Sequence, residues 1–329
     1  MICPCKSYHA PFLCFLCTVC AFLRKRKGNL RKVALAAICS GNRADSQATG
    51  NKEVNTMKKF DGILLCTDLD GTLLRNDKSI SEENLRAIAH FKAEGGLFTF
   101  VTGRMPYYVT ELYELVRPNA PIGCINGGGL YDYGTEKYLW AEELPREALT
   151  LVEAVERELP MIGIMVNTLF HVYLTRGNDA ADAFYRKSKA ERILLHYRDV
   201  EEPIGKILLS DSEEENILRL AAFLKAHPLA DRFSFVRSEH TLYEILPRGI
   251  DKGTVLPHLC KHVGIPLSRT VAVGDYENDT AMIRMAGLGV AVDNALPSVK
   301  AAADHVTVSN EEHAIARIIE DLECGRLSL

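Results

Sequence analysis

From residue 61 to the end of the chain, short apolar runs alternate with segments whose apolar residues recur at helical spacing. Residues 63–67 form a short apolar run, which is typical of a strand buried on both faces of a parallel sheet. Residues 81–93 have helical spacing, and Ser81 ahead of Glu82 and Glu83 predicts the N-cap. Further strands are predicted at 97–101, 122–125, 270–273, 289–292 and 305–308, and further helices at 106–116, 252–263, 279–285, 297–303 and 311–321.

Between residues 141 and 247 the pattern changes, because strands follow one another across short links. This segment predicts strands at 162–166, 171–175, 206–210, 234–236 and 242–246, and helices at 146–158, 180–191 and 213–226. Short links between adjacent strands favour antiparallel pairing. We therefore predict an α/β core with a parallel sheet, formed by residues 57–140 and 248–329, with an α+β module at 141–247 inserted into it. The crossings at 140–146 and 245–249 are expected to act as hinges.

The chain of 329 residues is 47% hydrophobic and 25% charged, which is ordinary for a globular protein. Its formal net charge of -4 is uneven: residues 1–56 carry nine basic and two acidic side chains, so the remainder is at -11. Such an acidic body argues against nucleic-acid binding, which needs a basic face. The ten cysteines show no disulfide framework, so we expect reduced thiols and a cytoplasmic location.

Residues 1–56 differ from the rest of the chain. The apolar stretch at 12–23 is shorter than a spanning helix needs, and its basic cluster follows it, whereas a secretory signal has basic residues first. Cys14, Cys17 and Cys20 have a metal-binding spacing without an obvious fourth ligand. Because Met57 directly precedes the first strand, we expect an N-terminal extension, disordered or arising from a mis-set start codon. A weak membrane anchor is the alternative, although no membrane association is expected for the body.

Polar side chains follow four predicted strands: Asp68 and Asp70, then Thr102 and Gly103, then Asn126, then Asp275, Asn278 and Asp279. Open α/β sheets bind ligands at the carboxyl ends of their strands, so these groups are expected at one edge. Asp68 and Asp275 are suitable oxygen ligands for Mg²⁺. A carboxylate can also attack a phosphoryl group, and Asp70, two residues on, can protonate the leaving alkoxide and then activate water.

Four motifs carry a family resemblance: Asp68-Leu69-Asp70-Gly71-Thr72, Thr102-Gly103-Arg104, Lys252-Gly253 and Gly274-Asp275-Tyr276-Glu277-Asn278-Asp279. In type and order they resemble the signature motifs of the haloacid dehalogenase (HAD) superfamily. The inserted module resembles the type IIB cap, and the Cof-type sugar-phosphate phosphatases are the most similar subfamily. The resemblance implies a Rossmann-like parallel-sheet core with a type IIB cap, and a Mg²⁺-dependent phosphatase acting on small phosphorylated metabolites.

The resemblance also implies a role for each motif residue. Asp68 would be the nucleophile and a metal ligand. Asp70 would be the general acid and base, and would bind the metal through its main-chain carbonyl. Asp275 would be the third metal ligand, and Asp279 would support the metal site without touching the ion. The phosphate would be held by Leu69, Thr102, Gly103, Lys252 and Asn278.

Two positions need a choice. Lys252 is preferred to Lys206 as the motif lysine, because it precedes a predicted helix 23 residues before Asp275, and Lys206 is interpreted as a solvated residue at a strand start. The run from Asn126 to Gly129 lacks the GxxxxGK[ST] pattern, so a plain turn beside the site is expected.

Substrate identity stays open, with sugar phosphates, FMN and pyridoxal phosphate as candidates. The cap residues considered as selectors are His171, Tyr173, Arg176, Tyr185 and Arg186. A sugar phosphomutase of the phosphomannomutase type is the alternative enzyme, and a non-catalytic ligand-binding protein is the alternative class. We expect a monomer or a weak homodimer.

Overall fold

The computed structural model describes residues 58–329, and these form one compact unit. The predictions for residues 1–56 therefore lie outside the described residues. None of the helices within 58–329 combines the length and apolar character needed to cross a membrane.

The core contains a five-stranded sheet in the order β14-β13-β12-β1-β2, with every pair parallel. Its strands are β1 (Leu64–Thr67), β2 (Leu97–Phe100), β12 (Thr270–Gly274), β13 (Leu288–Ala291) and β14 (His305–Val306). All four residues of β1 are buried, because side chains alternate between two covered faces. This confirms the predicted α/β core.

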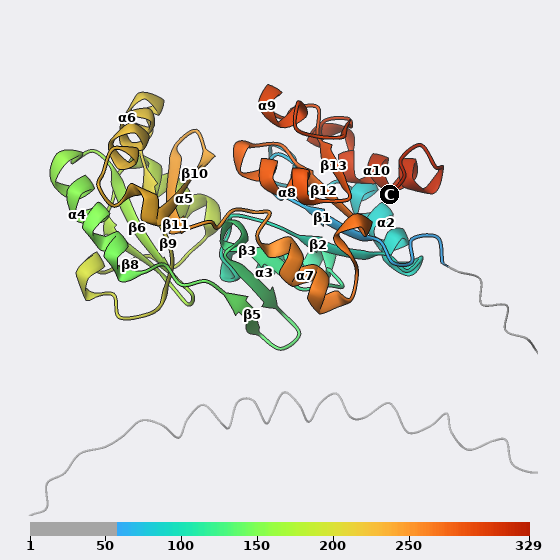
Figure 1. Ribbon diagram of the computed structural model, residues 1–329, viewed down its shortest axis with the longest axis horizontal. Helices are drawn as coiled ribbons and strands as arrows, with labels where there is room; N and C mark the ends of the chain where they lie inside the picture. The colour runs from blue at the N-terminus through green and yellow to red at the C-terminus, as the bar shows by residue number, and fades with distance from the viewer. Residues whose placement is uncertain (1–57) are drawn as a thin grey trace, which may run out of the picture. The chain divides into compact units, whose positions relative to one another are not determined.

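Helices cover both faces of this sheet: α2 (Glu82–Ala93), α3 (Thr110–Val116), α7 (Val255–Val263), α8 (Thr280–Met285), α9 (Pro297–Lys300) and α10 (Ala314–Glu323). Leu65 packs in one apolar cluster with residues of α2 and α10, whereas Leu64 and Cys66 pack in another with α7. Figure 1 shows α2 beside α10, with α7 apart from both. The Ser81 hydroxyl accepts a hydrogen bond from the Asn84 amide, which confirms the predicted N-cap of α2.

Residues 122–141 depart from the prediction. The third predicted strand, β3 (Ile122–Cys124), lies beside β2 and is paired with the parallel sheet by an isolated bridge between Val101 and Gly123. It belongs instead to a separate antiparallel sheet with β4 (Gly129–Asp132) and β5 (Lys137–Ala141), two strands that the sequence pattern did not predict. The predicted turn between β3 and β4 is present, and Gly127 has a φ of 92° there.

The inserted module is a second domain built on a six-stranded sheet in the order β10-β11-β9-β6-β7-β8. Its strands are β6 (Gly163–Thr168), β7 (Val172–Arg176), β8 (Ile193–Leu194), β9 (Ile204–Ser210), β10 (Phe233–Glu239) and β11 (Leu242–Pro247). All pairs are antiparallel, as predicted, except β7 with β8, the short strand that was missed. Its helices are α4 (Leu149–Glu158), α5 (Asp179–Ser188) and α6 (Glu214–Lys225).

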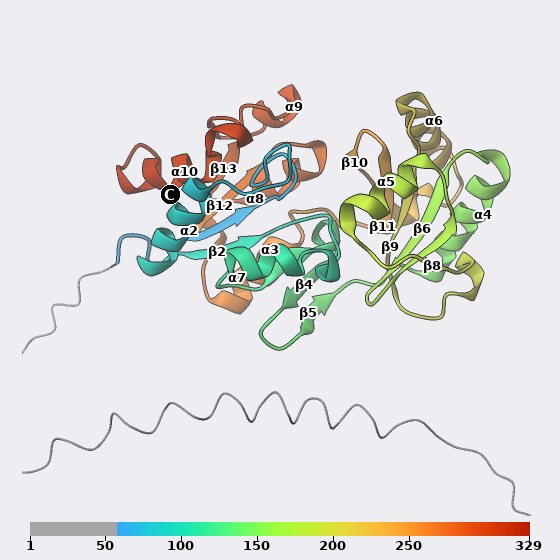
Figure 2. The same ribbon diagram turned by 180° about the vertical axis from the view of Figure 1, so that it is seen from behind.

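The two faces of the cap sheet have different neighbours. Residues of α4 and α6 share one apolar cluster with Ile164, Ile207 and Ile245, while α5 packs on the opposite face around Met165 and Leu208. In Figures 1 and 2, α5 lies on the side of the cap nearer the core.

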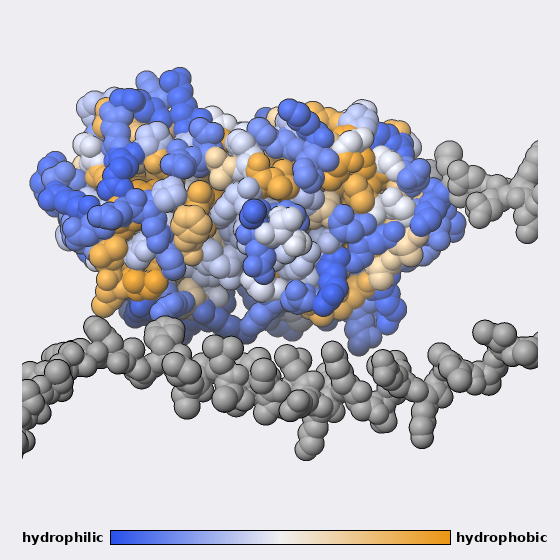
Figure 3. Space-filling model, turned by 90° about the horizontal axis from the view of Figure 1, so that it is seen from below, coloured by the Kyte–Doolittle hydropathy of each residue, from blue (hydrophilic) through white to orange (hydrophobic). Residues whose placement is uncertain are grey.

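Exposed large apolar side chains are spread over both domains: Leu115, Leu139, Met161, Phe170, Leu194, Leu218, Met285 and Val306. On the face shown in Figure 3, hydrophobic patches alternate with hydrophilic areas. Single exposed apolar residues are normal in globular proteins, so we assign this surface no function.

Candidate active site

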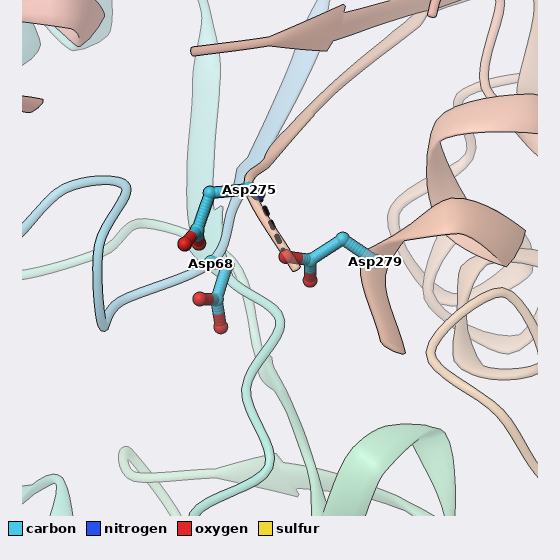
Figure 4. A group of neighbouring side chains, drawn as sticks. All are labelled: Asp68, Asp275 and Asp279. Carbon is cyan, nitrogen blue, oxygen red and sulfur yellow. Dashed lines mark hydrogen bonds between the residues drawn. The ribbon is translucent and has the colours of Figure 1, made fainter. Parts of the chain in front are cut away.

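The candidate site begins where β1 and β12 end side by side. The amide of Asp68 donates to the carbonyl of Val273 (2.9 Å), which fixes the chain just past β1 against β12. Asp275 follows β12 directly, so two carboxylates meet at the carboxyl edge of the sheet, as predicted. One oxygen each from Asp68, Asp275 and Asp279 lies within 4.8 Å of the other two. Figure 4 shows these three side chains together.

Asp279 holds the others in place. One of its oxygens accepts hydrogen bonds from the amides of Asp275 (2.9 Å) and Tyr276 (3.0 Å), the first of which is dashed in Figure 4. Its other oxygen accepts from the Lys252 ammonium (2.6 Å). Since both oxygens already have donors, Asp279 is better suited to positioning its neighbours than to binding an ion.

Lys252 is buried between two carboxylates. Its Nζ donates to Asp68 Oδ1 and to Asp279 Oδ1, both at 2.6 Å. Burial opposes its charge, but Asp279 and Asp68 outweigh that effect and hold the pKa of Lys252 above its usual value. The residue lies three positions before α7, in a turn and not in the predicted helix. It is thus a fixed positive charge beside Asp68.

The carboxylates nevertheless outnumber this cation. Burial raises the pKa of Asp68 to about 7, against the opposing effect of Lys252. Burial also raises the pKa of Asp275 to about 8, reinforced by repulsion from Asp279 and Asp68. A hard divalent cation with oxygen ligands would relieve this crowding, so the donor set fits such a cation.

Gly71 is required where the motif turns toward Asp275. Its φ is 81°, a conformation that side chains other than glycine rarely adopt. A Cβ at this position would lie 2.4 Å from Asp275 Oδ2. The next residue, Thr72, donates its hydroxyl to Asp275 Oδ1 (2.8 Å). The Asp-Gly-Thr part of the motif therefore shapes the pocket around Asp275.

Asp70 faces the cavity but is held by cations. The Arg104 guanidinium donates to both of its oxygens (2.9 Å each), and Lys78 donates to Oδ1 (2.9 Å). Lys187 of the cap lies 3.6 Å away. Burial would raise the pKa of Asp70, but Arg104, Lys187 and Lys78 together hold it well below its usual range. Asp70 is therefore ionised in this arrangement.

A polar network joins the Thr102-Gly103 loop to the cap. Lys206 Nζ donates to the carbonyl of Gly103 and to Glu244 Oε2, both at 2.8 Å. The same Glu244 oxygen accepts from Asn126 Nδ2 (2.7 Å), and Asn126 Oδ1 accepts from Asn278 Nδ2 (2.9 Å). Lys206 is only 4% exposed, so its interpretation as a solvated residue was wrong. It is an interior residue of β9 and a bridge between cap and core.

The predicted phosphate ligands lie around one space. Thr102, Gly103, Lys252 and Asn278 line a cavity of about 100 Å³, together with Asp68 and Asp70. The side chain of Leu69 is fully buried in the core, so only its main chain is available to a phosphate. Asp275 does not line this cavity but stands beside Asp68.

The cap contributes a wall that the sequence analysis did not identify. Its lining residues are Asn167, Phe184, Lys187, Ser188, Lys206, Leu208, Ser238, Glu239, Leu242 and Glu244. None of the five predicted selectors lines the cavity. Arg176, for example, donates to the carbonyls of Glu156, Leu159 and Ile162 within the cap. The sequence offered these five as candidates, and the structure places them outside the lining because their position on the cap sheet could not be predicted.

Comparison with known proteins agrees with this geometry. A family model described as haloacid dehalogenase-like hydrolase matches residues 65–319. A Bacillus subtilis phosphatase is 29% identical, over 79% of this chain and 99% of its own. A second B. subtilis relative, a 5-amino-6-(5-phospho-D-ribitylamino)uracil phosphatase, is 27% identical, over 78% of this chain and 96% of its own. A solved HAD subclass IIB sugar phosphatase superposes with a TM-score of 0.69, at 22% identity, over 78% and 98% of the two chains.

Proposed function

Since the chain belongs to the haloacid dehalogenase-like hydrolases and is a phosphatase, we propose that it hydrolyses small phosphate monoesters through an aspartyl-phosphate on Asp68. The observation that carries this proposal is the placement of Asp68. Asp68 lines the cavity, the residue is 6% exposed, and its carboxylate accepts a hydrogen bond from Lys252 at 2.6 Å. A fixed nucleophile beside a buried cation suits phosphoryl transfer, where positioning and charge stabilisation supply most of the catalysis.

The reaction divides into two steps. Asp68 attacks phosphorus, the ester P–O bond breaks, and Asp70 gives its proton to the leaving alkoxide. Asp70 then takes a proton from water, which attacks the aspartyl-phosphate, releases inorganic phosphate and restores Asp68. To carry a proton, Asp70 must exchange its ion pairs with Arg104, Lys78 and Lys187. A bound phosphate supplies that exchange, because its oxygens compete for the same cations.

Asp68 and Asp275 would hold Mg²⁺ through their carboxylates, and Asp70 would hold it through its main-chain carbonyl. The ion would supply charge neutralisation on the phosphoryl oxygens. Asp279 keeps Asp275 and Lys252 in position for this site. Lys252, Thr102, Asn278 and the amides of Leu69 and Gly103 would hold the phosphate.

The substrates are proposed to be small phosphorylated metabolites such as sugar phosphates, FMN and pyridoxal phosphate. The name of the ribitylaminouracil phosphatase among the relatives adds that phosphate ester to the candidates. The free cysteines Cys66, Cys124, Cys260 and Cys324 are compatible with the expected cytoplasmic location. A monomer or weak homodimer stays the expected state.

The test is a kinetic comparison of the full chain with two variants. Asp68→Asn removes the nucleophile, and Asp231→Asn makes the same change on the exposed surface of the cap. We expect phosphate release from a panel of sugar phosphates with Mg²⁺ and without any bisphosphate activator. Asp68→Asn should be inactive and Asp231→Asn unchanged. A strict requirement for a bisphosphate would instead indicate a phosphomutase, and wild-type turnover by Asp68→Asn would contradict the mechanism.

A further inference from the structure

Three buried polar atoms beside the cavity find no hydrogen-bond partner among residues 58–329. They are Nδ2 and Oδ1 of Asn167 and the hydroxyl oxygen of Tyr108. Both residues line the cavity, and Asn167 is only 1% exposed. Buried polar groups in folded proteins are nearly always hydrogen-bonded, so an exception needs an explanation. Three exceptions at one cavity point to a ligand that completes them.

The position of Asn167 tells which part of a ligand it would meet. Asn167 in β6 is paired directly opposite Lys206 in β9, so the two side chains stand on the same face of the cap sheet. Lys206 reaches the carbonyl of Gly103, in the loop proposed to hold phosphate. The side chain of Asn167 is therefore next to that of Lys206 on the cap sheet, beside the proposed phosphate position. The leaving group of a bound ester would lie at this place.

Tyr108 approaches from the core. It lies at the end of the short turn Pro106–Tyr108, and its ring meets that of Phe184 in α5 edge to face, with centroids 5.8 Å apart. The hydroxyl of Tyr108 and the amide of Asn167 thus come from different domains to the same cavity. A ligand that bonds both would be held only when the cap and core are together.

The pairing of charges in the cavity disfavours leaving groups that carry an ammonium or a carboxylate. Each charged side chain of the lining has a partner of opposite charge: Asp68 with Lys252, Asp70 with Arg104, Glu239 with Lys187, and Glu244 with Lys206. The walls between them include the apolar Met105, Leu208 and Leu242. An ammonium or carboxylate on the leaving group would be buried without a counter-charge, which is strongly unfavourable.

We propose that Asn167 and Tyr108 form a specificity subsite for the leaving group, selecting uncharged groups with hydroxyl or amide functions over those with an ammonium or a carboxylate. The side-chain amide of Asn167 can donate one hydrogen bond to the ligand and accept another. The Tyr108 hydroxyl can act as a donor or as an acceptor. A site built to hydrogen-bond its substrate discriminates strongly, because a wrong group leaves the buried polar atoms unpaired. This inference rests on the proposed phosphatase function.

The test compares matched phosphate esters by kcat/KM. The pairs are glucose 6-phosphate with glucosamine 6-phosphate or 6-phosphogluconate, and glycerol 3-phosphate with ethanolamine phosphate. The wild type should prefer the uncharged member of each pair by at least about tenfold. Asn167→Asp should lower the preference for glucose 6-phosphate over glucosamine 6-phosphate by about tenfold, because the new carboxylate pairs with the ammonium. Leu218→Asp, at a 54% exposed position of α6, adds the same charge behind the cap sheet and should not change it.

Asn167→Leu separates a binding role from a structural one. It removes the unpaired amide and keeps the side-chain size, so the melting temperature should rise while the preference is lost. If Asn167 served only the stability of the fold, Asn167→Leu would lower the melting temperature and leave the preference for uncharged esters unchanged. Tyr108→Phe deletes only the hydroxyl and should lower kcat/KM for the uncharged esters several-fold, which keeps the proposal testable if the Asn167 variants misfold.

Hydrolysis of p-nitrophenyl phosphate separates a failure of the subsite proposal from a failure of the proposed phosphatase function. If the wild type hydrolyses it but shows no preference within the pairs, or if Asn167→Asp leaves the preference unchanged, the subsite proposal is overturned and the phosphatase function stands. If the wild type hydrolyses neither this ester nor any of the panel, the proposed function fails and the subsite fails with it.

Discussion

Two buried lysines, Lys252 from the core and Lys206 from the cap, reach the same cavity and are paired quite differently. Lys252 donates to Asp68 and Asp279, which stand where the reaction is proposed to occur. Lys206 donates to Glu244 of its own domain and to a main-chain carbonyl of Gly103 across the domain boundary. The first is placed to act on the reacting groups, and the second to connect two domains. Burial and charge alone do not distinguish them.

The largest effect is expected from Lys252→Met. Without its ammonium, Asp68 loses its partner and the phosphoryl oxygens lose a fixed positive charge. Removing one such group typically lowers kcat by about 10²–10³, and we expect the upper end because Asp279 is also left without its cation. Steady-state kinetics measures this. Lys225→Met, at the exposed end of α6, is the matched control. A loss below tenfold would contradict the role given to Lys252.

Breaking the second pair should affect stability more than turnover. Glu244→Gln leaves Lys206 buried without a counter-charge, and removing one partner of a buried pair costs about 3–5 kcal/mol. The double variant Lys206→Met with Glu244→Leu should recover part of that loss, because no charge remains unpaired. Urea unfolding measures both. Because neither side chain contacts Asp68, kcat should stay within about tenfold. A thousandfold fall in kcat of the stable double variant would place Lys206 among the reacting groups.

Adding a metal ion should also distinguish the surroundings of Lys252 from those of Lys206, because only the core side of the cavity holds excess negative charge. Mg²⁺ at 100 times its Kd should stabilise the protein by about 2.7 kcal/mol, seen as a higher melting temperature. Asp275→Asn should remove that gain and also stabilise the metal-free protein, because it relieves repulsion with Asp68 and Asp279. Asp231→Asn should keep the full gain. An undiminished gain in Asp275→Asn would exclude Asp275 as a ligand.

The smallest effect is expected at the partly exposed link between the domains. Lys187 lies 3.6 Å from Asp70 and pairs with Glu239, and its side chain is 36% exposed. Solvent-exposed pairs contribute about 0–1 kcal/mol, so Lys187→Met should change kcat/KM by no more than about fivefold. The difference from wild type should shrink at high salt, which screens the pair. Kinetics at two ionic strengths tests this, and a difference that grows with salt would argue against an electrostatic link.

The sequence predicted the grouping of Asp68 and Asp275 at the carboxyl edge of the sheet, because that grouping depends on strand order and short motifs. β1 and β12 are adjacent, so Asp68 and Asp275 follow neighbouring strands in space although they are far apart in sequence. Glycines and hydroxyls in the same motifs, such as Gly71 and Thr72, then shape the site locally. These features could be predicted without knowing how the cap contacts the core.

The cap side was predicted poorly because it depends on register and on contacts between domains. Asn167 and Lys206 share a face only through the exact pairing of β6 with β9, which no periodicity supplies. One signal was available: Lys206 and Glu244 each interrupt an otherwise apolar strand, and a charge within a buried strand implies a partner. β4 was missed because it begins within a glycine run that was expected to form a turn, and β5 because its apolar run is only four residues long, Tyr138–Ala141.

Asp68 is proposed to carry the phosphoryl group during turnover. Rapid quenching of the full chain during turnover with Mg²⁺ and a hydrolysed ester, followed by peptide mass spectrometry under acidic conditions, would detect that intermediate. We expect a phosphoryl adduct on Asp68 that forms and decays at rates compatible with kcat, and that is absent in Asp68→Asn. Turnover without an adduct on Asp68, with inversion of configuration at a chiral phosphorus, would contradict this proposal, because two displacements must retain configuration.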